Sequence, residues 1–384
     1  GPGMDIQNLM GARALSAREA AGLAQSAVAG RLGIARQTLA SMEQGRVPFD
    51  GVQLVTMADL YGRPVTYFYD LRETEGLALA FRADNPRAVD LALKQRLLDR
   101  LAAIADLEIA AGLEADRGRG LPPTEPLTKA GPRELQIART VAQEERGRLG
   151  IGDRAPVSDP VALLESLDIR VIPFAEEPVA GNVLSGFSAF STALGAGIFV
   201  NTHPGLPIEH QIFCVMHEYA HLIFHRDVYR EPAESYRTRG AAASPEEKIA
   251  NTFAGTFLVP DGALRQHAGT LGRITPTDVM RLKRLFRVSF TSLVTRLHQE
   301  GYLNKADNAR LWGIAKQRGW DRQEPEPLQE LPAYGRRTEA LARVAWERGE
   351  ASLAFLEEVL GKDRLAMRDL VADWEQDAQV DAVQ

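Results

Sequence analysis

The chain has 384 residues, of which 45% are hydrophobic and 25% are charged, and its formal net charge is −6. This length exceeds what a single hydrophobic core usually serves, so we expect several domains. The negative net charge excludes a protein whose whole surface coats nucleic acid, although one small domain can still bind DNA. No run approaches the roughly 18 consecutive apolar residues that a membrane span requires, so we expect no membrane partner.

Cysteine usage and the start of the chain both indicate the cytoplasm. The single cysteine, Cys214, cannot form an internal disulfide, which fits a reducing compartment. The opening residues GPGMDIQ lack the charged and apolar segments of a secretion signal. We therefore expect a cytoplasmic location.

The first predicted domain, residues 11–75, consists of short helices separated by glycines. In GLAQSAVAGRLGIARQTLASMEQGRV, two helices flank a tight turn with Gly33 at its centre, and Val28, Ile34 and Leu39 form the seam between them. This spacing predicts a helix-turn-helix. The side chains that its second helix presents to base edges or phosphates are Arg36, Gln37, Thr38 and Ser41.

Over about residues 16–69 this domain resembles the Xre/Cro-repressor family. The resemblance implies DNA binding, with Gln25 starting the first of the two helices against the DNA backbone. Ala35 stands where family members carry a Ser or Thr cap, which loses about 1 kcal/mol. From Arg13 to Asp70 the arginines outnumber the acids by only one, so we expect a homodimer to bind DNA. A module that docks only proteins is the alternative.

Three further segments follow in chain order. Residues 76–131 combine an amphipathic helix at about 89–113 with a linker rich in Pro, Gly and charge. We expect a second domain at 132–303, in which helical patterns precede two apolar strands, IRVIPF and GAGIFVNTH, as in an α+β arrangement. Residues 304–384 form a predicted helical C-terminal region in which we find no chemistry.

The stretch VMHEYAHLIF carries the strongest chemical signal. On a helix, His217 and His221 lie on one face, so two imidazoles can bind one metal ion. Glu218 points beside that face and can accept a proton from a metal-activated water during attack on a carbonyl. Zn²⁺ is the expected ion, with Mn²⁺ as an alternative. An ordinary buried helix that contains imidazoles is the competing interpretation.

A catalytic zinc takes three protein ligands, and the stretch SPEEKIANTFAGTFLVP offers the third. Ser244 and Pro245 are a helix start, followed by Glu246 and Glu247. We select Glu247, because Asn251 lies one turn further on, where its amide can orient a metal-bound histidine.

Two other metal ligands are weaker candidates. Asp227 lies ten residues after His217, but the longer motif with that spacing needs a glycine where Phe224 stands. His225 is interpreted as a helix-end residue, because three histidines spread over about 12 Å of straight helix cannot converge on one ion.

The block from about residue 134 to 303 resembles the ImmA/IrrE family of metallopeptidases. The matching stretches are LLESLDIRVIPF, IFVN, HEYAHLIFH, EEKIANTFAGTFLVP and VSFTSLVTRLHQEGYL. The resemblance implies a minimal zincin-like fold, with His217, His221 and Glu247 as metal ligands and Glu218 as general base. Several members cleave a transcriptional repressor. The predicted fold class is therefore multidomain and mainly α, with a helix-turn-helix bundle, a zincin-like α+β core with a small sheet, and a helical C-terminal region.

Further expectations follow from this resemblance. The strand GIFVN is the expected exposed edge on which a substrate peptide adds as a strand. Candidates for stabilising the oxyanion are Tyr229, His298 and Tyr302.

Two functions are consistent with these patterns. The first is a metal-dependent endopeptidase with its own DNA-binding domain, which cleaves a transcriptional repressor or an antitoxin-like regulator in a stress or phage response. The second is a DNA-binding transcriptional regulator whose peptidase-like domain senses a ligand or metal with little or no proteolysis. The intact Glu218 favours the first, because a sensor needs no general base.

Overall fold

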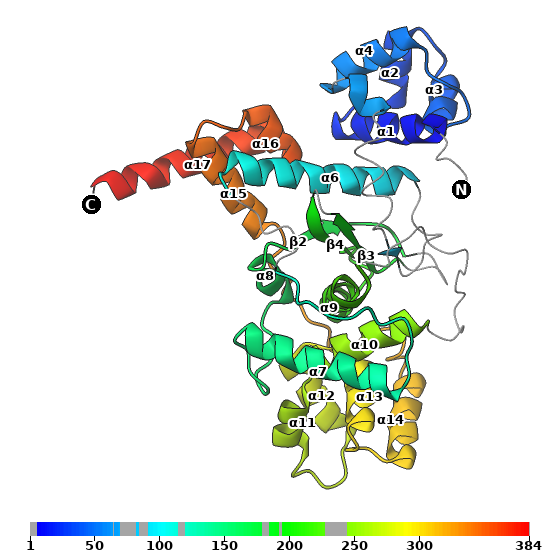
Figure 1. Cartoon of the computed structure of the whole chain (residues 1–384), viewed down its shortest axis with the longest axis vertical. Coiled ribbons are helices and arrows are strands. Elements are labelled where there is room, and N and C mark those ends of the chain that lie inside the picture. The colour runs from blue at the N-terminus through cyan, green and yellow to red at the C-terminus, as the bar shows by residue number, and fades with distance from the viewer. Residues whose placement is uncertain are drawn as a thin grey trace. The chain divides into compact units, whose positions relative to one another are not determined.

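The computed structural model describes residues 6–63, 65–69, 82–83, 91–113, 120–178, 184–191, 194–226 and 244–383. The chain divides into two compact units (Figure 1). Unit 1 comprises Gly1–Ala78, Arg87–Ala115 and Thr338–Gln384, and unit 2 comprises Leu79–Pro86 and Asp116–Arg337. The units therefore do not follow the linear order of the chain. The domain boundaries proposed from the sequence stay predictions.

Unit 1 begins with a small helical bundle. Its elements are α1 (Ile6–Ala20), α2 (Gln25–Leu32), α3 (Arg36–Glu43), α4 (Gly51–Tyr61) and the 3₁₀ helix η1 (Val65–Phe68). Leu39, Met57 and Phe68 are fully buried in its core. Gly33 ends α2 with a φ of 69°, a left-handed conformation that glycine adopts without strain. This glycine sets the turn into α3.

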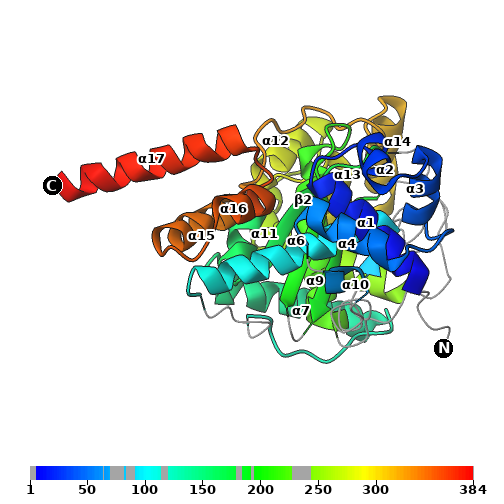
Figure 2. The same ribbon diagram turned by 90° about the horizontal axis from the view of Figure 1, so that it is seen from above.

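The rest of unit 1 comes from the connecting segment and the C-terminal region. It consists of α6 (Leu91–Ala110), α15 (Arg336–Glu347), α16 (Leu353–Leu360) and α17 (Arg364–Val383). Helix α6 packs against α1, and its apolar residues at helical spacing, including Leu97, Leu98 and Leu101, are buried. Helix α16 lies beside α6, and α17 follows it (Figure 2). The N-terminal bundle and the C-terminal helices therefore share α6 as a support.

Unit 2 contains a small sheet with the strand order β1-β3-β4-β2. The strands are β1 (Arg82–Ala83), β2 (Arg170–Phe174), β3 (Gly186–Ser191) and β4 (Gly195–Asn201). Strand β4 is parallel to β2 and antiparallel to β3, and all its residues are buried. The expectation that GIFVN is an exposed edge is therefore wrong, because β4 has hydrogen-bonded neighbours on both sides. Strand β3, which the sequence analysis did not identify, takes the position towards β1.

Helices form the remainder of unit 2. They are α7 (Pro132–Arg148), α8 (Pro160–Glu165), α9 (Ile208–His225), α10 (Pro245–Leu258), α11 (Asp261–Ala268), α12 (Pro276–Phe286), α13 (Phe290–Gln299) and α14 (Lys305–Gln317). Helix α9 is buried on nearly every side, because it lies between the sheet and α10. Its motif residues are therefore held by packing on all faces.

A glycine brings the sheet into direct contact with α9. A Cβ atom at Gly186 would lie 2.5 Å from Cys214 Sγ and 2.4 Å from the carbonyl oxygen of Phe199. Only glycine permits this approach, so β3 rests on α9 one turn before the first motif histidine. Close packing here fixes the helix against the sheet.

The observed architecture confirms the predicted fold class, a mainly helical chain with a small α+β core. None of the described helices combines the length and the apolar character that crossing a membrane would demand.

Candidate metal centre and helix-turn-helix

Two helices of unit 2 bring three ligand atoms together. Helix α9 contributes His217 and His221, whose Nε2 atoms lie 3.1 Å apart. Helix α10 contributes Glu247, whose Oε2 lies 3.0 Å from His217 Nε2 and whose Oε1 lies 3.2 Å from His221 Nε2. Among the described residues these three form a cluster that can hold a metal ion.

This cluster fits a tetrahedral zinc site. Zinc bonds of about 2.0–2.1 Å in a tetrahedron place neighbouring ligand atoms about 3.3 Å apart. The distances among the two nitrogens and the carboxylate oxygens of Glu247 are 3.0, 3.1 and 3.2 Å, which approach that spacing. Two imidazoles and one carboxylate are also a donor set of catalytic zinc sites, which leave one position for water.

Asn251 determines how His217 presents its ring. The Nδ1 atom of His217 lies 2.9 Å from Asn251 Oδ1. An amide oxygen only accepts hydrogen bonds, so Nδ1 carries the proton and donates it. The lone pair of His217 is then on Nε2, which faces Glu247. Asn251 therefore sets the tautomer that a metal ligand needs.

His225 orients the ring of His221 in the same way as Asn251 orients the ring of His217. His225 Nε2 donates to the carbonyl oxygen of Leu127 over 2.8 Å, so its Nδ1 is left as an acceptor. His221 Nδ1 lies 2.8 Å from that acceptor and donates to it. His221 therefore presents an unprotonated Nε2 to the cluster. His225 is the last residue of α9, as predicted, and lies outside the cluster. Its completely buried ring has an additional role that the sequence analysis missed, which is to orient His221.

The helix start at Ser244 positions Glu247. The backbone N–H of Glu247 donates to Ser244 Oγ over 3.2 Å, which caps the first turn of α10. Burial raises the pKa of Glu247, but His217 and His221 lower it more, so the net pKa is well below its ordinary value. Glu247 is therefore an anionic carboxylate, the form in which it binds a cation.

Glu218 follows His217 on α9 and is 1% exposed. Its burial keeps bulk water away from the carboxyl group. His210, two turns before His217, lies with Nε2 2.7 Å from Ser185 Oγ. Burial, and secondly the proximity of His217, lower the pKa of His210, so its ring is neutral near the cluster.

Two of the oxyanion candidates, His298 and Tyr302, are not brought to the cluster. His298 Nδ1 lies 3.0 Å from the carbonyl oxygen of Leu303, at the end of α13. Tyr302 is half-buried near Asp261 of α11. In the described part of the chain, no hydrogen bond, ion pair or ring contact joins either side chain to the histidines. Tyr229 and the weaker ligand candidate Asp227 lie outside the described residues.

The predicted DNA-facing side chains lie together on the bundle of unit 1. Arg36 and Gln37 are exposed at the start of α3, whereas Thr38 and Ser41 are half-buried. Gln25 begins α2, and its Oε1 accepts a hydrogen bond from Arg36 Nε over 3.4 Å. Ala35 precedes α3 with extended backbone and provides no side-chain cap, as its residue type predicts.

A buried ion pair holds these helices in register. Arg18 of α1 donates from Nε to Glu43 Oε1 over 2.6 Å, and Gln25 Nε2 donates to Glu43 Oε2 over 2.8 Å. Glu43 thus connects α1, α2 and α3 through charge-assisted bonds. The sequence analysis missed this role. The sequence feature that could have revealed this role is an acidic residue at the end of a short helix whose other buried positions are apolar.

Comparison with known families agrees with this geometry. Residues 164–298 match the IrrE N-terminal-like domain of a peptidase family, and residues 9–66 match a helix-turn-helix domain. The chain joins a helix-turn-helix domain to an IrrE-like domain. No curated protein matches it. The matches confirm the fusion predicted from the sequence, and the helix-turn-helix domain supports DNA binding.

A cavity of about 510 Å³ lies beside the cluster in the IrrE-like domain. Asn251 lines it, and so does Phe213, whose ring centre is 6.4 Å from that of His217. Thr291 and Ser292 of α13 are also among the residues that line it. The residues that line the cavity include both polar and apolar side chains, and its volume suits one or two side chains of a ligand.

Proposed function

We propose that the protein is a metal-dependent endopeptidase that hydrolyses a peptide bond in a transcriptional repressor or antitoxin-like regulator. The observation that carries this proposal is the convergence of two imidazole nitrogens and the Glu247 carboxylate next to Glu218 within an IrrE-like domain. His217, His221 and Glu247 are the metal ligands, with Zn²⁺ as the preferred ion and Mn²⁺ as the alternative. The protein acts as a homodimer on DNA in a stress or phage response.

The proposed chemistry is attack of water on a peptide carbonyl. When bound, Zn²⁺ supplies Lewis acidity, which polarises a carbonyl and lowers the pKa of a water molecule. Glu218 accepts the proton of that water on its carboxylate while the carbon–oxygen bond forms. It then delivers the proton to the amide nitrogen as the carbon–nitrogen bond breaks. Asn251 and His225 hold the two ligand rings throughout, so that both Nε2 lone pairs keep their direction.

Two features of the IrrE-like domain support a peptide as the substrate. Strand β3 packs on α9, and the two-residue strand β1 pairs with its outer side and forms that edge of the sheet. An extended peptide adds to such an edge by main-chain hydrogen bonds. The cavity lined by Phe213 and Asn251 is then next to the reacting bond and receives a substrate side chain. Together they provide backbone recognition and a specificity pocket.

The DNA contacts are proposed for α3. Arg36 and Gln37 are exposed and reach base edges or phosphates, whereas Thr38 and Ser41 make shorter contacts from the same helix. Gln25 contacts the DNA backbone at the start of α2 and is oriented by its bond to Glu43. This domain brings the peptidase to DNA where its repressor substrate is bound.

The proposal is tested by mapping new protein N-termini in a lysate of the native host. Wild-type protein is expected to produce N-termini that disappear when a zinc chelator is added. Glu218→Gln is expected to produce none of them while binding as much zinc, and His217→Ala is expected to lose both zinc and cleavage. The same set of N-termini from wild type and Glu218→Gln, or none from either, would contradict the proposed activity.

A further inference from the structure

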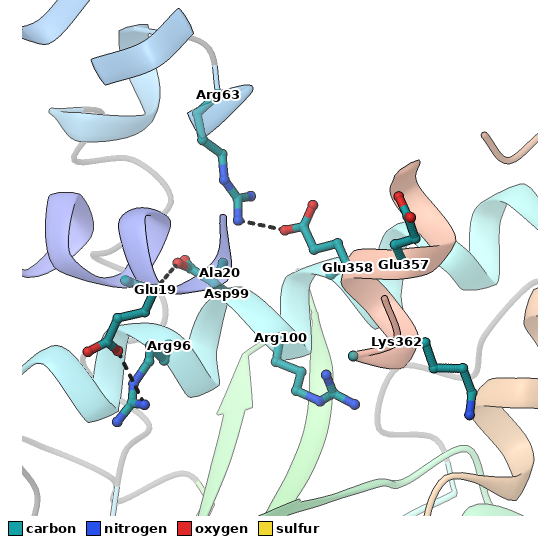
Figure 3. A pocket seen from close by; sticks show the side chains of 12 residues that line it. Glu19, Ala20, Arg63, Arg96, Asp99, Arg100, Glu357, Glu358 and Lys362 are labelled. Carbon is teal, nitrogen blue, oxygen red and sulfur yellow. Dashed lines mark hydrogen bonds and ion pairs between the residues drawn. The ribbon is translucent and has the colours of Figure 1, made fainter. Parts of the chain in front are cut away.

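A second cavity lies entirely within unit 1, away from the chemistry described above. It has a volume of about 430 Å³ and lies between α1, α6 and α16 (Figure 3). Its lining is strongly charged. The cations are Arg63, Arg96, Arg100 and Lys362, and the acids are Glu19, Asp99, Glu357 and Glu358. A cavity with this many charges is a poor site for an apolar molecule.

Three of the four acids already form ion pairs. Glu358 Oε1 lies 2.6 Å from Arg63 Nη2, and Glu19 Oε2 lies 3.3 Å from Arg96 Nη1. These two pairs neutralise two of the cations. Glu357 Oε1 lies 2.6 Å from the Nε of Arg364, which does not line the cavity.

Asp99 is engaged by neutral donors. Its Oδ2 accepts a hydrogen bond from Ser16 Oγ over 3.0 Å and another from the hydroxyl of Tyr67. Its Oδ1 accepts from Gln95 Nε2 over 2.8 Å. Three donors satisfy this carboxylate without a cation.

Arg100 and Lys362 are left without an acid partner. No side-chain hydrogen bond or ion pair links either of them to another residue in the part of the chain that the structure describes. Arg100 is half-buried, and burial lowers the pKa of its guanidinium. It extends from α6 towards the end of α16 that carries Lys362 (Figure 3). Two cations without a direct acid partner therefore line the cavity.

The end of α16 offsets only part of this charge. Arg100 Nη1 would lie 3.8 Å from a Cβ built on Gly361, so the guanidinium is near the C-terminus of that helix. A helix C-terminus corresponds to about half a negative charge. Together with the Asp99 carboxylate, whose hydrogen-bond donors are all neutral, the helix end leaves about half a positive charge from the two cations. A half-buried guanidinium without a counter-charge is unfavourable unless something else supplies that charge.

We propose that this cavity binds a small organic anion that carries a carboxylate or phosphate group, with Arg100 and Lys362 as the cations that hold it. A guanidinium donates two parallel hydrogen bonds to either group, and an ammonium adds a third donor. The volume suits a metabolite-sized ligand and is too small for a folded partner. The bound anion contacts the helix-turn-helix bundle through α1 and the C-terminal region through α16, so its binding is linked to the DNA-binding half of the protein. This site goes beyond the proposed peptidase activity.

The proposal is tested by thermal unfolding and calorimetry of the full chain with inorganic phosphate or succinate, against chloride at equal ionic strength. A saturable rise in Tm is expected with at least one of the two anions, and the one that responds identifies the acidic group. Arg100→Met and Lys362→Gln are each expected to weaken binding by about ten- to a hundred-fold, the loss of one charge-assisted hydrogen-bonding group. Arg368→Gln is the control, because it removes an exposed arginine of α17 outside the cavity.

Two further comparisons distinguish anion binding in this cavity from anion binding elsewhere on the protein. The double variant Arg36→Ala, Gln37→Ala is expected to keep the anion response, whereas loss of the response would place the anion on the DNA-binding face and overturn the proposal. Arg100→Met is expected to unfold in chloride at the wild-type Tm or above it, because it removes an unpaired charge. An Arg100→Met protein that responds to phosphate and succinate as wild type does, or the absence of any saturable response in wild type, would also overturn it.

Discussion

His221 and His225 lie one turn apart on α9 with their Nδ1 atoms 2.8 Å from each other. Because His225 donates its other nitrogen to the carbonyl oxygen of Leu127, it can only accept the proton of His221. A chain of two hydrogen bonds thus links the proposed metal ligand to a loop residue that precedes α7. Such outer partners orient a ligand ring and fix its tautomer.

His225→Ala is therefore expected to weaken zinc binding about 10- to 100-fold without removing a ligand. The measurement is competition for zinc with a chelator of known affinity. His225→Asn is expected to recover part of the affinity, because its amide oxygen can accept from His221. His267→Ala, which removes a half-buried ring on α11, serves as the control and should bind zinc as wild type does. Equal zinc affinity in His225→Ala and wild type would refute this role.

Glu218→Gln is expected to separate metal binding from catalysis. The amide occupies the same space but accepts no proton, so cleavage should fall by about 10²- to 10⁴-fold while the zinc content is unchanged. The cleavage rate is measured on a peptide that spans a cleavage site identified with the wild-type protein. The zinc content is measured by elemental analysis. A fall in zinc content that accounts for the lost rate would instead assign Glu218 a role in metal binding.

Glu165, at the end of α8, makes the stability of unit 2 depend on pH. Burial raises its pKa to about 7, and the opposing effect of Arg337 does not offset this. The folded state therefore binds the proton more tightly than the unfolded chain, whose pKa is near 4.5. The stabilisation that Glu165 contributes to the folded state is fully present below pH 4.5 and is lost as the pH rises through 7.

Glu165→Gln should consequently match wild type in free energy of unfolding near pH 4.5. It should exceed wild type by on the order of 2 kcal/mol at pH 8. Urea unfolding followed by tryptophan fluorescence at both pH values measures the difference, with Glu144→Gln, on the exposed side of α7, as a charge-matched control. Parallel pH profiles of Glu165→Gln and wild type would show that Glu165 does not govern this dependence.

The exposed start of α3 predicts a loss of DNA affinity in the double variant Arg36→Ala, Gln37→Ala. Removing one cation from the DNA face should also reduce the slope of log K against log salt by about one. Binding to promoter DNA from the native host is measured at several salt concentrations, with Arg368→Gln as the charge-matched control. Peptidase activity on a peptide substrate should stay unchanged. Unaltered affinity and slope would show that DNA is bound by another surface.

The local parts of the site were predictable from the sequence because they depend on spacing along helices. Four-residue spacing places His217 and His221 on one face, and the Ser244 cap fixes where Glu247 falls on α10. The one-turn spacing of Glu247 and Asn251 likewise predicted the contact to His217. These relationships require only helix periodicity and capping.

The parts that were missed depend on partners distant in the chain. His225 is paired through Leu127, 98 residues earlier, so the helix pattern alone cannot reveal its role. Strand β3 reads GFSAFS, a glycine- and serine-containing stretch without strong alternation, and its omission left β4 as an apparent edge. Strand order depends on which strands pair across long sequence separations, and a run of apolar residues predicts a strand but not its partners. The grouping of Thr338–Gln384 with the N-terminal bundle is non-local in the same sense.

The central claim is that one metal ion is bound jointly by α9 and α10. It is tested most directly by anomalous X-ray diffraction at the zinc edge from crystals of the zinc-loaded protein. We predict one strong peak per chain, at about 2.0–2.1 Å from the Nε2 atoms of His217 and His221 and from a carboxylate oxygen of Glu247. A peak bonded to the histidines but not to Glu247, or no peak between α9 and α10, would contradict the account.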